Sequence, residues 1–432
     1  MTGVKIIGAG LAGCEAAYCL AERGVKVTLC DIKPKAFTPA HSDKNYGELV
    51  CSNSLKSDDV YFNACGLLKQ EMRILGSLII EAADNTRVPA GAALAVERQE
   101  FSRYITEKIK NHPNIEAVCD EADKIPDEPC IVATGPLTCG GLAEDINKKL
   151  GGGLYFYDAS APIVSRESID FSFAFEGDRY GKGGDDYINC PLSKEGYYAF
   201  AEALVSAEKA ALHSFDKREF FEGCMPVEVM AARGVDTLRF GPFKPVGLTD
   251  GDGNKFFAVL QLRKENAEGS AYNLVGCQTN LKFGEQKRVF SMIPALKNAE
   301  FLRYGVMHRN TYINSPEHLN GDFSLKSNPD VFFAGQITGV EGYVESAASG
   351  LMAAIGFLRR AEGKDTQLPP EHTICGALSR HISSPNANFQ PMNANFGILN
   401  CDKRIRDKKE RYRYLAERAL KEIQEYKDKL CQ

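Results

Sequence analysis

The sequence predicts an α/β fold, in which a doubly wound parallel sheet carries an inserted α+β domain. Two observations predict the sheet: residues 4–23 read as a strand, a glycine turn and a helix, and residues 331–360 repeat that order. A third observation predicts the insert, because residues 161–325 contain short apolar runs separated by turns rich in Gly, Asp and Asn. We therefore expect one discontinuous domain, 1–160 plus 326–432, and one inserted, substrate-facing domain, 161–325.

The N-terminal unit predicts a dinucleotide site. A buried strand at 5–7 runs into a G-x-G-x-x-G motif, formed by Gly8, Ala9, Gly10, Leu11, Ala12 and Gly13. The first glycine makes the tight turn, the second lets the backbone approach a pyrophosphate, and the third lets helix and strand pack closely. The helix over 14–23 directs its positive end at the phosphates. A second strand, 25–30, ends at Asp31, whose carboxylate is placed for a ribose. The alternative is an ordinary glycine-rich turn.

The C-terminal unit indicates which dinucleotide is held. A strand over 130–136 ends in Gly135, and a strand over 331–336 runs into Gly335 and Gln336. Tyr343 then precedes a helix over 346–360 that is rich in small residues. A returning strand–glycine–helix half completes the flavin site in glutathione-reductase-like FAD-binding folds. The sequence therefore favours FAD over NAD as the tightly held cofactor.

The remaining runs predict the other elements. We expect helices over 67–83 and 97–112, and strands over 256–262, 271–275 and 289–293. The polar loop over 33–66 is long for a connection beside a cofactor site, which favours a functional role. Residues 402–432 predict an amphipathic helix that either packs with its charged face in solvent or contacts RNA.

Composition and charge narrow the class of protein. The chain has 432 residues, a net charge of −5 and no apolar run of membrane-span length, so we expect a cytoplasmic protein with no membrane association. Its 14 cysteines include no C-x-x-C pair, so we expect no metal site. Cys14 and Cys19 lie too far apart around the first helix to form a disulfide.

Several unusual motifs make the chain resemble, along nearly its whole length, the TrmFO family of folate- and FAD-dependent tRNA uracil-C5 methyltransferases. These motifs are residues 8–13, 48–54, 223–228, 308–312, 335–343 and 388–397. Some are shared with MnmG, a flavoprotein that modifies wobble uridines, but MnmG is longer and residues 388–397 resemble TrmFO instead.

The resemblance implies a reaction. Methylenetetrahydrofolate supplies the carbon, reduced FAD supplies the reducing equivalents, and NADPH or NADH reduces the flavin again. The product is 5-methyluracil at position 54 in the T-loop of tRNA, with no protein partner required. Two alternatives stay open: the same chemistry on a 23S rRNA uracil, and an MnmG-like or non-methylating RNA-binding flavoprotein.

The reaction needs a thiolate, a base and a reductant in one pocket, because uracil C5 becomes nucleophilic only when a thiolate adds to C6. The resemblance and the polar, loop-like contexts favour Cys224 as this nucleophile, with Arg233 near enough in sequence to lower its pKa. Cys51 would be the second thiol, acting as general base or protecting the reactive methylene. The two roles could be exchanged. Cys30, Cys130 and Cys277 lie in apolar runs and are expected in the core.

Each of the other candidate site residues has two possible interpretations. Tyr343 is either a lid over the flavin or a core aromatic, and Arg98 either approaches the flavin or forms a surface ion pair. His308 either stacks on the folate or is simply hydrogen-bonded, and Arg309 and Tyr312 join it as substrate candidates. Scattered cations of the inserted domain would neutralise RNA phosphates or form a solvated face: Arg233, Arg239, Lys244, Lys282, Lys287 and Arg288.

Overall fold

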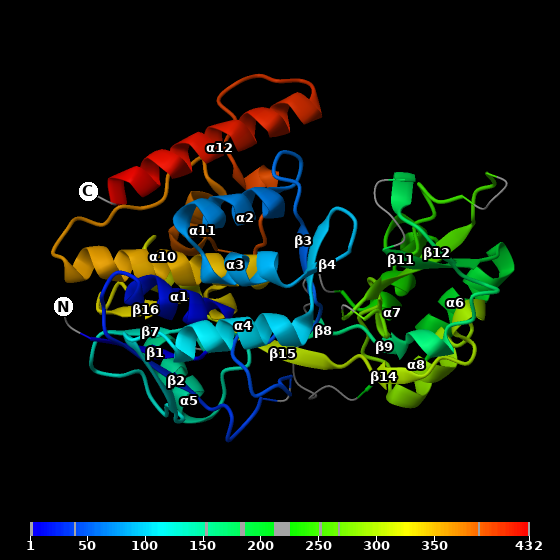
Figure 1. The fold of residues 1–432 in the computed structure, drawn as a ribbon, viewed down its shortest axis with the longest axis horizontal. Coiled ribbons are helices and arrows are strands. Elements are labelled where there is room, and N and C mark those ends of the chain that lie inside the picture. The colour runs from blue at the N-terminus through cyan, green and yellow to red at the C-terminus, as the bar shows by residue number, and fades with distance from the viewer. Residues whose placement is uncertain are drawn as a thin grey trace.

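The computed structural model of the chain describes residues 3–38, 40–151, 154–181, 186–210, 225–249, 253–266, 268–387 and 389–430. Two bodies lie side by side and are joined by a narrow connection (Figure 1). One hydrophobic core contains residues between Val4 and Leu150 together with residues between Ile313 and Tyr426. The other contains residues between Val164 and Ala299.

The first body is built on a five-stranded, fully parallel sheet. Its strand order is β16 (Val331–Phe333), β7 (Cys130–Val132), β1 (Val4–Ile7), β2 (Val27–Asp31) and β6 (Ile115–Cys119). Helices α1 (Leu11–Ala21) and α10 (Tyr343–Ala361) lie on one side of the sheet and α5 (Gly140–Leu150) on the other (Figure 1). The predicted α/β class and doubly wound parallel sheet are confirmed.

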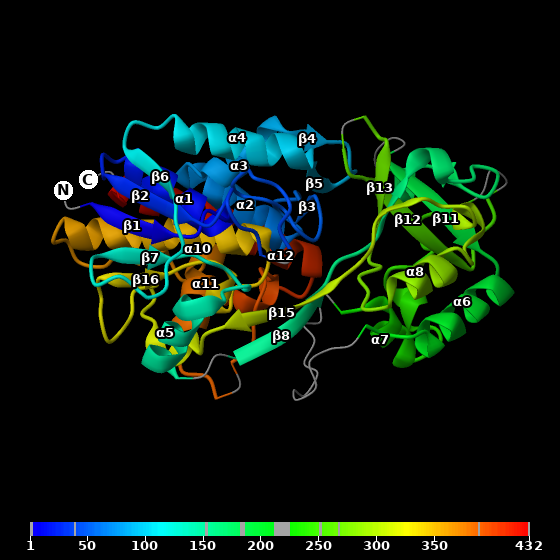
Figure 2. The same ribbon diagram turned by 90° about the horizontal axis from the view of Figure 1, so that it is seen from below.

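Close packing of α1 on α10 brings the two glycine units together. A Cβ on Gly350 of α10 would lie 2.2 Å from the Ala12 carbonyl oxygen, and one on Gly335 would lie 3.2 Å from the Ala12 Cβ. The helices therefore touch through backbone, which only small residues allow. Figure 2 shows the two helices side by side, running along the strands of the parallel sheet. As a result, the turns that follow β1 and β16 share one edge of the sheet.

In its described residues, the second body contains a six-stranded sheet with three helices on it, as expected for an α+β insert. The strand order is β10 (Phe175–Glu176), β11 (Tyr187–Leu192), β12 (Ala258–Lys264), β13 (Ala271–Leu274), β9 (Ile163–Ser165) and β14 (Phe301–Arg303). Alternate residues such as Ile188, Leu262 and Leu274 enter a core with helices α6 (Lys194–Ser206), α7 (Val227–Ala232) and α8 (Phe283–Phe290). The opposite face is polar and turns toward the first body.

A two-stranded antiparallel ribbon connects the bodies (Figure 2). It pairs β8 (Leu154–Ala159) with β15 (Met307–Tyr312). Ile313, Leu319, Phe323 and Leu325 already pack in the first core, although they precede the boundary expected at residue 326. The chain thus returns to the first body as soon as the ribbon ends.

The other elements of the first body surround the parallel sheet. A three-stranded antiparallel sheet has the order β3 (Ser54–Ser57), β5 (Ala93–Val96) and β4 (Arg87–Val88). The further helices are α2 (Ala64–Leu75), α3 (Leu78–Asn85), α4 (Arg98–Lys110), α9 (Ser315–His318), α11 (Ile374–Ser383) and α12 (Lys408–Leu430). Short 3-10 turns complete the chain at 166–168, 179–181, 237–240, 294–296, 336–338 and 396–398.

Two expected elements are corrected. The single helix over 67–83 is broken, because Gly76 adopts φ 84° and ends α2, and Ser77 then caps α3. The strand over 289–293 is wrong: residues 289 and 290 end helix α8, and Ile293 leads into the 3-10 turn at Pro294. In the part of the chain that the structure describes, no helix combines the length and apolar character that crossing a membrane requires.

Candidate functional site

A cleft of about 690 Å³ lies at the carboxyl edge of the parallel sheet, where the two bodies meet. Ligands bind at this edge in open α/β sheets because helix N-termini and strand-end loops converge there. Most predicted cofactor residues line the cleft: Gly8, Ala9, Gly10, Leu11, Ala12, Asp31, Gly135, Gly335, Gln336 and Tyr343. Cys51 lines it as well, and Arg263, Asn273 and Gln278 form the wall on the second body.

The glycine turn has the geometry that its three roles require. Gly8 has φ 99°, and a Cβ there would lie 2.5 Å from the Ala133 carbonyl oxygen. A Cβ on Gly13 would lie 1.8 Å from the Gly8 carbonyl oxygen, so this glycine is needed for packing. Gly10 instead faces open space, with no atom within 4 Å of a Cβ, and it caps the N-terminus of α1. The backbone at Gly10 is therefore open to a phosphate.

Asp31 is fixed beside this turn. Its Oδ2 accepts a hydrogen bond from Ala9 N at 2.6 Å, and its Oδ1 accepts one from Lys33 N at 2.8 Å. A buried ion pair follows, because Lys33 Nζ contacts Glu48 Oε2 at 2.7 Å. The carboxylate keeps lone pairs for a ribose hydroxyl while the turn holds its orientation.

Hydrogen bonds also fix the glycine turn of the C-terminal strand–glycine–helix unit. Gly335 has φ 85°, and its N–H donates to Ser349 Oγ of α10 at 2.6 Å. Gln336 donates through Nε2 to Glu341 Oε2. A Cβ on Gly135 would meet no atom within 4 Å. Gly135 therefore leaves its backbone open to the cleft, whereas Gly335 is buried and packs close to Ala12.

Cys51 and Tyr343 form a close pair, although 292 positions separate them in sequence. The Tyr343 Oη accepts the N–H of Cys51 at 2.7 Å and that of Ser52 at 3.3 Å. These bonds engage both lone pairs of the phenol, so its own hydrogen is directed to Cys51 Sγ, 2.9 Å away. In this arrangement the sulfur is the acceptor of the hydrogen bond. Burial, and next the nearby sulfur, raise the pKa of Tyr343 well above its usual value, so the phenol keeps its proton.

Arginines of both bodies surround this pair. Arg98 lies at the start of α4 and pairs with Glu265 at 2.7 Å. This pair is largely buried, unlike the surface ion pair that the sequence offered as one alternative, and approach to a flavin stays a prediction. Arg263 donates to Ser52 Oγ at 2.7 Å and to Asn53 Oδ1 at 3.2 Å. These bonds tie the second body to the loop that carries Cys51.

One polar row crosses the sheet of the second body and was missed by sequence reasoning. Tyr187, Arg263, Asn273, Ile163 and Arg303 are successive cross-strand partners, so their side chains share one face. Asn273 Nδ2 and the Nε and Nη2 atoms of Arg303 are buried and have no hydrogen-bond partner among the described residues. Burial, and next the positive charge of Arg98, lower the pKa of Arg303. Only the strand register reveals this row, and the sequence carries no signal for that register.

The remaining candidates are placed as follows. Cys224 lies outside the described residues; next to it, Met225 is buried, and Val227 N donates to the carbonyl of Gln278, a cleft residue, at 2.7 Å. His308 and Arg309 lie on β15, and their side chains are outside the described part of the chain. Tyr312 is buried against Phe389, with ring centroids 6.0 Å apart, so it packs behind the cleft wall and substrate contact stays a prediction.

The cysteines divide as expected from their contexts. Cys30, Cys130 and Cys277 are buried in the two bodies, and Cys14 and Cys19 are free thiols. Among the described residues, no group of three or more His, Cys, Asp or Glu side chains could hold a metal ion.

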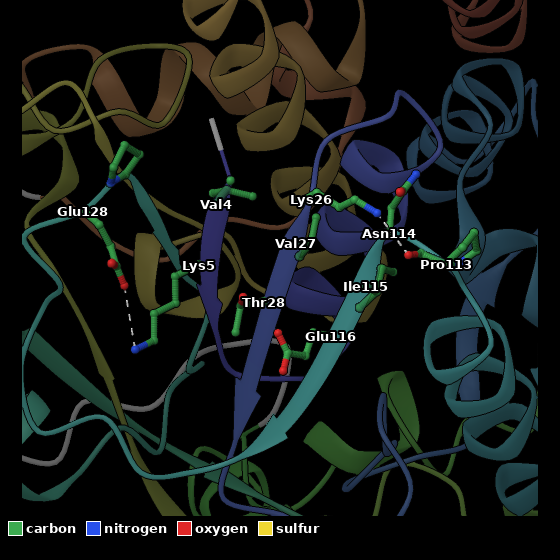
Figure 3. Close-up of a pocket in the computed structure, with 12 residues that line it drawn as sticks. Val4, Lys5, Lys26, Val27, Thr28, Pro113, Asn114, Ile115, Glu116 and Glu128 are labelled. Carbon is green, nitrogen blue, oxygen red and sulfur yellow. Dashed lines mark hydrogen bonds and ion pairs between the residues drawn. The ribbon is translucent and has the colours of Figure 1, made fainter. Parts of the chain in front are cut away.

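A second hollow, of about 630 Å³, lies across β1, β2 and β6 at their amino ends (Figure 3). Lys5 pairs loosely with Glu128 at 3.9 Å, and Lys26 Nζ donates to the Pro113 carbonyl at 3.3 Å. This edge lies opposite the carboxyl ends where α/β sheets bind ligands, and none of the predicted site residues lines it. The cleft is therefore the candidate site.

Comparisons with known proteins agree with this geometry. The family model described as glucose inhibited division protein A matches residues 3–365. The methylenetetrahydrofolate--tRNA-(uracil-5-)-methyltransferase TrmFO of Acetivibrio thermocellus is 56% identical, with 99% of each chain covered. The protein of the same name from Listeria monocytogenes is 55% identical, again with 99% of each chain covered.

A solved structure supports the fold. The GidA structure of Aquifex aeolicus superposes with a TM-score of 0.73 at 16% identity, covering 99% of this chain and 73% of that one. With sequence identity above one half over almost the whole length, the resemblance seen in the motifs is confirmed. The chain belongs to the TrmFO family, within the wider family of glucose inhibited division protein A.

Proposed function

We propose that this chain is a methylenetetrahydrofolate–tRNA (uracil-5-)-methyltransferase that methylates C5 of the T-loop uracil at position 54. Reduced FAD would be the reductant, and NADPH or NADH would restore it. The single observation that carries the proposal is the Cys51–Tyr343 pair, with a sulfur-to-oxygen distance of 2.9 Å, in a cleft that both glycine units line. The names printed for the TrmFO relatives supply the substrate class.

The cleft residues fit FAD. Gly10 offers open backbone at the N-terminus of α1, which suits a pyrophosphate, and Asp31 is held where it can meet a ribose. Gly135 leaves room on the opposite wall, which Gly335 also lines. When bound, FAD would supply the hydride that turns the transferred methylene group into a methyl group.

The chain's own residues would supply nucleophile and base. Cys224 would add to C6 of the uracil, so that C5 attacks the methylene carbon and the folate nitrogen leaves that carbon. Cys51, held as a hydrogen-bond acceptor by Tyr343, would then accept the C5 proton, and the C6–sulfur bond would break to release Cys224, although the roles of the two thiols could be exchanged. The unpaired donors of Asn273 and Arg303 suit the carbonyl oxygens of a uracil ring, where negative charge develops.

The proposal is tested by incubating the holoenzyme with an unmodified tRNA transcript, methylenetetrahydrofolate and NADPH, and measuring 5-methyluracil by mass spectrometry. A transcript with cytosine at position 54 and a 23S rRNA fragment identify the target. We expect product on the first RNA alone, and loss of at least about a thousandfold in Cys51→Ala and Cys224→Ala. Cys139→Ala, an exposed cysteine of the cleft wall, is the matched control.

Two outcomes would contradict the proposal. Product on the rRNA fragment alone would favour the same chemistry on rRNA. No product from flavin-loaded, reducible protein, with NADPH oxidised equally in the absence of folate and RNA, would favour a non-methylating flavoprotein. Loss of bound flavin in Cys51→Ala would show that this residue is structural.

A further inference from the structure

The segment 403–413, which enters helix α12, carries seven cations and two carboxylates in a chain whose net charge is −5. Its cations are Lys403, Arg404, Arg406, Lys408, Lys409, Arg411 and Arg413. All but Arg411 are exposed. Across the described residues, none of the seven forms an ion pair. We name this segment, together with the neighbouring Phe62, the basic rim.

Lack of pairing distinguishes this rim from the cations of the second body. There, Arg239 pairs with Asp236 at 3.0 Å, Lys282 with Glu208 at 2.6 Å, and Arg288 with Glu285 at 2.6 Å. These partners neutralise three of the six cations that the sequence offered as an RNA face. The basic rim, by contrast, places seven cations within eleven consecutive residues, and none of them is paired among the described residues.

Four of the seven rim cations lie over aromatic rings instead of pairing with carboxylates. Lys403 lies 4.4 Å from the Tyr414 ring centroid, Lys408 lies 5.4 Å from that of Tyr412, and Arg413 lies 5.7 Å from that of Phe62. A cation–π contact orients a cation without cancelling its charge. Lys408, Lys409 and Arg411 also occupy the first turn of α12, where each opposes the helix dipole by about 0.3–1 kcal/mol. The arrangement thus costs stability and retains charge, which is typical of a binding surface.

The rim adjoins the cleft from two directions. Phe62 precedes Asn63, which lines the cleft, and Phe396 follows the cleft residues Asn393 and Ala394. The Phe396 ring stacks on Tyr412, with centroids 4.3 Å apart. In Figure 1 the N-terminal end of α12 lies above β3, on the side of the first body that faces the second.

We propose that the basic rim binds the phosphate backbone of the folded RNA whose target base enters the cleft. Unpaired guanidinium and ammonium groups in a row beside the cleft match a polyanion, and Tyr61 and Phe62, 43% and 39% exposed, offer faces for stacking. A lipid surface fits less well: Leu415, Ala419 and Ile423 on the apolar stripe of α12 are buried, so no apolar face is left to insert. This inference rests on the proposed function and extends it.

The test measures the affinity of the FAD-loaded protein for a labelled, unmodified tRNA by fluorescence anisotropy between about 50 and 300 mM NaCl. The rim variant is Arg404→Gln/Arg406→Gln/Lys409→Gln, three exposed cations that touch no aromatic ring among the described residues. The matched control is Lys421→Gln/Lys427→Gln/Lys429→Gln, near the other end of the same helix. Both variants should melt within a few degrees of the wild-type protein, because substitutions at surface positions usually change stability by less than about 0.5 kcal/mol.

We expect the rim variant to bind tRNA at least about tenfold more weakly at low salt, with the slope of log Kd against log salt reduced by about 2. The control should keep both the affinity and the slope. Equal behaviour of the two variants would overturn the proposal. So would unchanged tRNA binding in a rim variant that no longer binds vesicles containing phosphatidylserine, because the rim would then be a lipid surface.

Measuring methylation by the wild-type protein under the same conditions distinguishes failure of the basic-rim proposal from failure of the proposed methyltransferase function. Wild-type 5-methyluracil formation with an unchanged salt slope in the rim variant would reject the basic rim alone. A reduced slope in the rim variant, with no product from the wild-type protein, would reject the proposed methyltransferase and leave the RNA surface in place.

Discussion

At the level of single residues, Gly10 and Gly13 have different roles: Gly10 leaves space for a ligand, and Gly13 is needed for the fold. Both belong to one motif, yet a Cβ on Gly10 meets open cleft and one on Gly13 meets the Gly8 carbonyl at 1.8 Å. The sequence predicts the motif, and the structure tells which glycine serves the fold. Substitutions at the two positions should therefore fail in different ways.

We predict that Gly10→Val folds but does not retain FAD, because the side chain would occupy the space proposed for the pyrophosphate. Gly13→Val should instead lower the melting temperature steeply or prevent folding, since the backbone cannot move aside. Flavin absorbance per protein and thermal unfolding measured by circular dichroism check both variants. Full flavin occupancy in Gly10→Val would contradict the assignment of the cofactor site.

Tyr343 is a second residue whose contribution can be tested alone, through its hydrogen bond to Cys51. In Tyr343→Phe the sulfur of Cys51 loses its hydrogen-bond donor, so its thiolate becomes less favourable. A hydrogen bond to a charged group contributes about 1.5–3 kcal/mol, so its loss should raise the pKa of the thiol. The pH dependence of Cys51 alkylation, followed on its own peptide by mass spectrometry, should therefore move to higher pH.

The internal control is Cys139, an exposed thiol of the same cleft, whose alkylation profile should not change in Tyr343→Phe. An unchanged Cys51 profile in a variant that still folds and binds flavin would show that Tyr343 does not donate to the sulfur. In that case the expected role of Tyr343 as a lid would become the better interpretation.

At the level of elements, two buried glutamates join helices by capping their neighbours. Glu15 of α1 accepts hydrogen bonds from Ser77 Oγ and from the backbone N–H groups of residues 78 and 79, at the start of α3. Glu71 of α2 accepts bonds from Ile374 N at 2.8 Å and Cys375 N at 2.9 Å, at the start of α11. Burial is the main cause that raises the pKa of each carboxyl to about 7.

These shifts predict how stability depends on pH. The folded state holds the proton of Glu71 up to about pH 7, whereas the unfolded chain releases it near the ordinary value of 4.5. The stabilisation is therefore complete below the lower value and is lost as pH rises through the higher one. For this carboxyl the loss is on the order of 3 kcal/mol.

Glu71→Gln should remove this contribution, because the amide does not titrate. Urea unfolding at pH 5.5 and pH 8 should show a smaller fall in the free energy of unfolding than in the wild-type protein. Exposed Glu410→Gln, on α12, is the control and should keep the full fall. A Glu71→Gln protein with the wild-type pH dependence would place the titrating group elsewhere.

Comparison of the predicted and observed elements shows which strands can be predicted from sequence patterns and which cannot. The strands β1, β2, β7 and β16 were predicted within a few residues, because buried parallel strands read as short apolar runs that end in glycine turns. The run 289–293 looks the same in sequence, but its apolar residues are the buried end of α8. Periodicity alone does not separate a short strand from one helical turn.

For the whole molecule, the motifs predicted the α/β class, the parallel sheet and the presence of an insert, because each depends on contiguous residues. The pairing of Cys51 with Tyr343 and the polar row through Arg263 and Asn273 depend on how distant segments meet. Strand register and the docking of two bodies set those contacts, and neither is written in local spacing. The packing of Ile313, Leu319, Phe323 and Leu325 in the first core is likewise a tertiary contact that local spacing does not reveal.

The return of the chain to the first body has a consequence during synthesis on the ribosome. β16 fills one edge of the parallel sheet by pairing with β7, and about 200 residues separate the two strands, so this closure has high contact order. While those residues are still being translated, β7 exposes an unsatisfied edge, and α1 lacks the surface of α10 that covers it. The nascent N-terminal segment must therefore be shielded or remain loosely collapsed until α10 has left the exit tunnel.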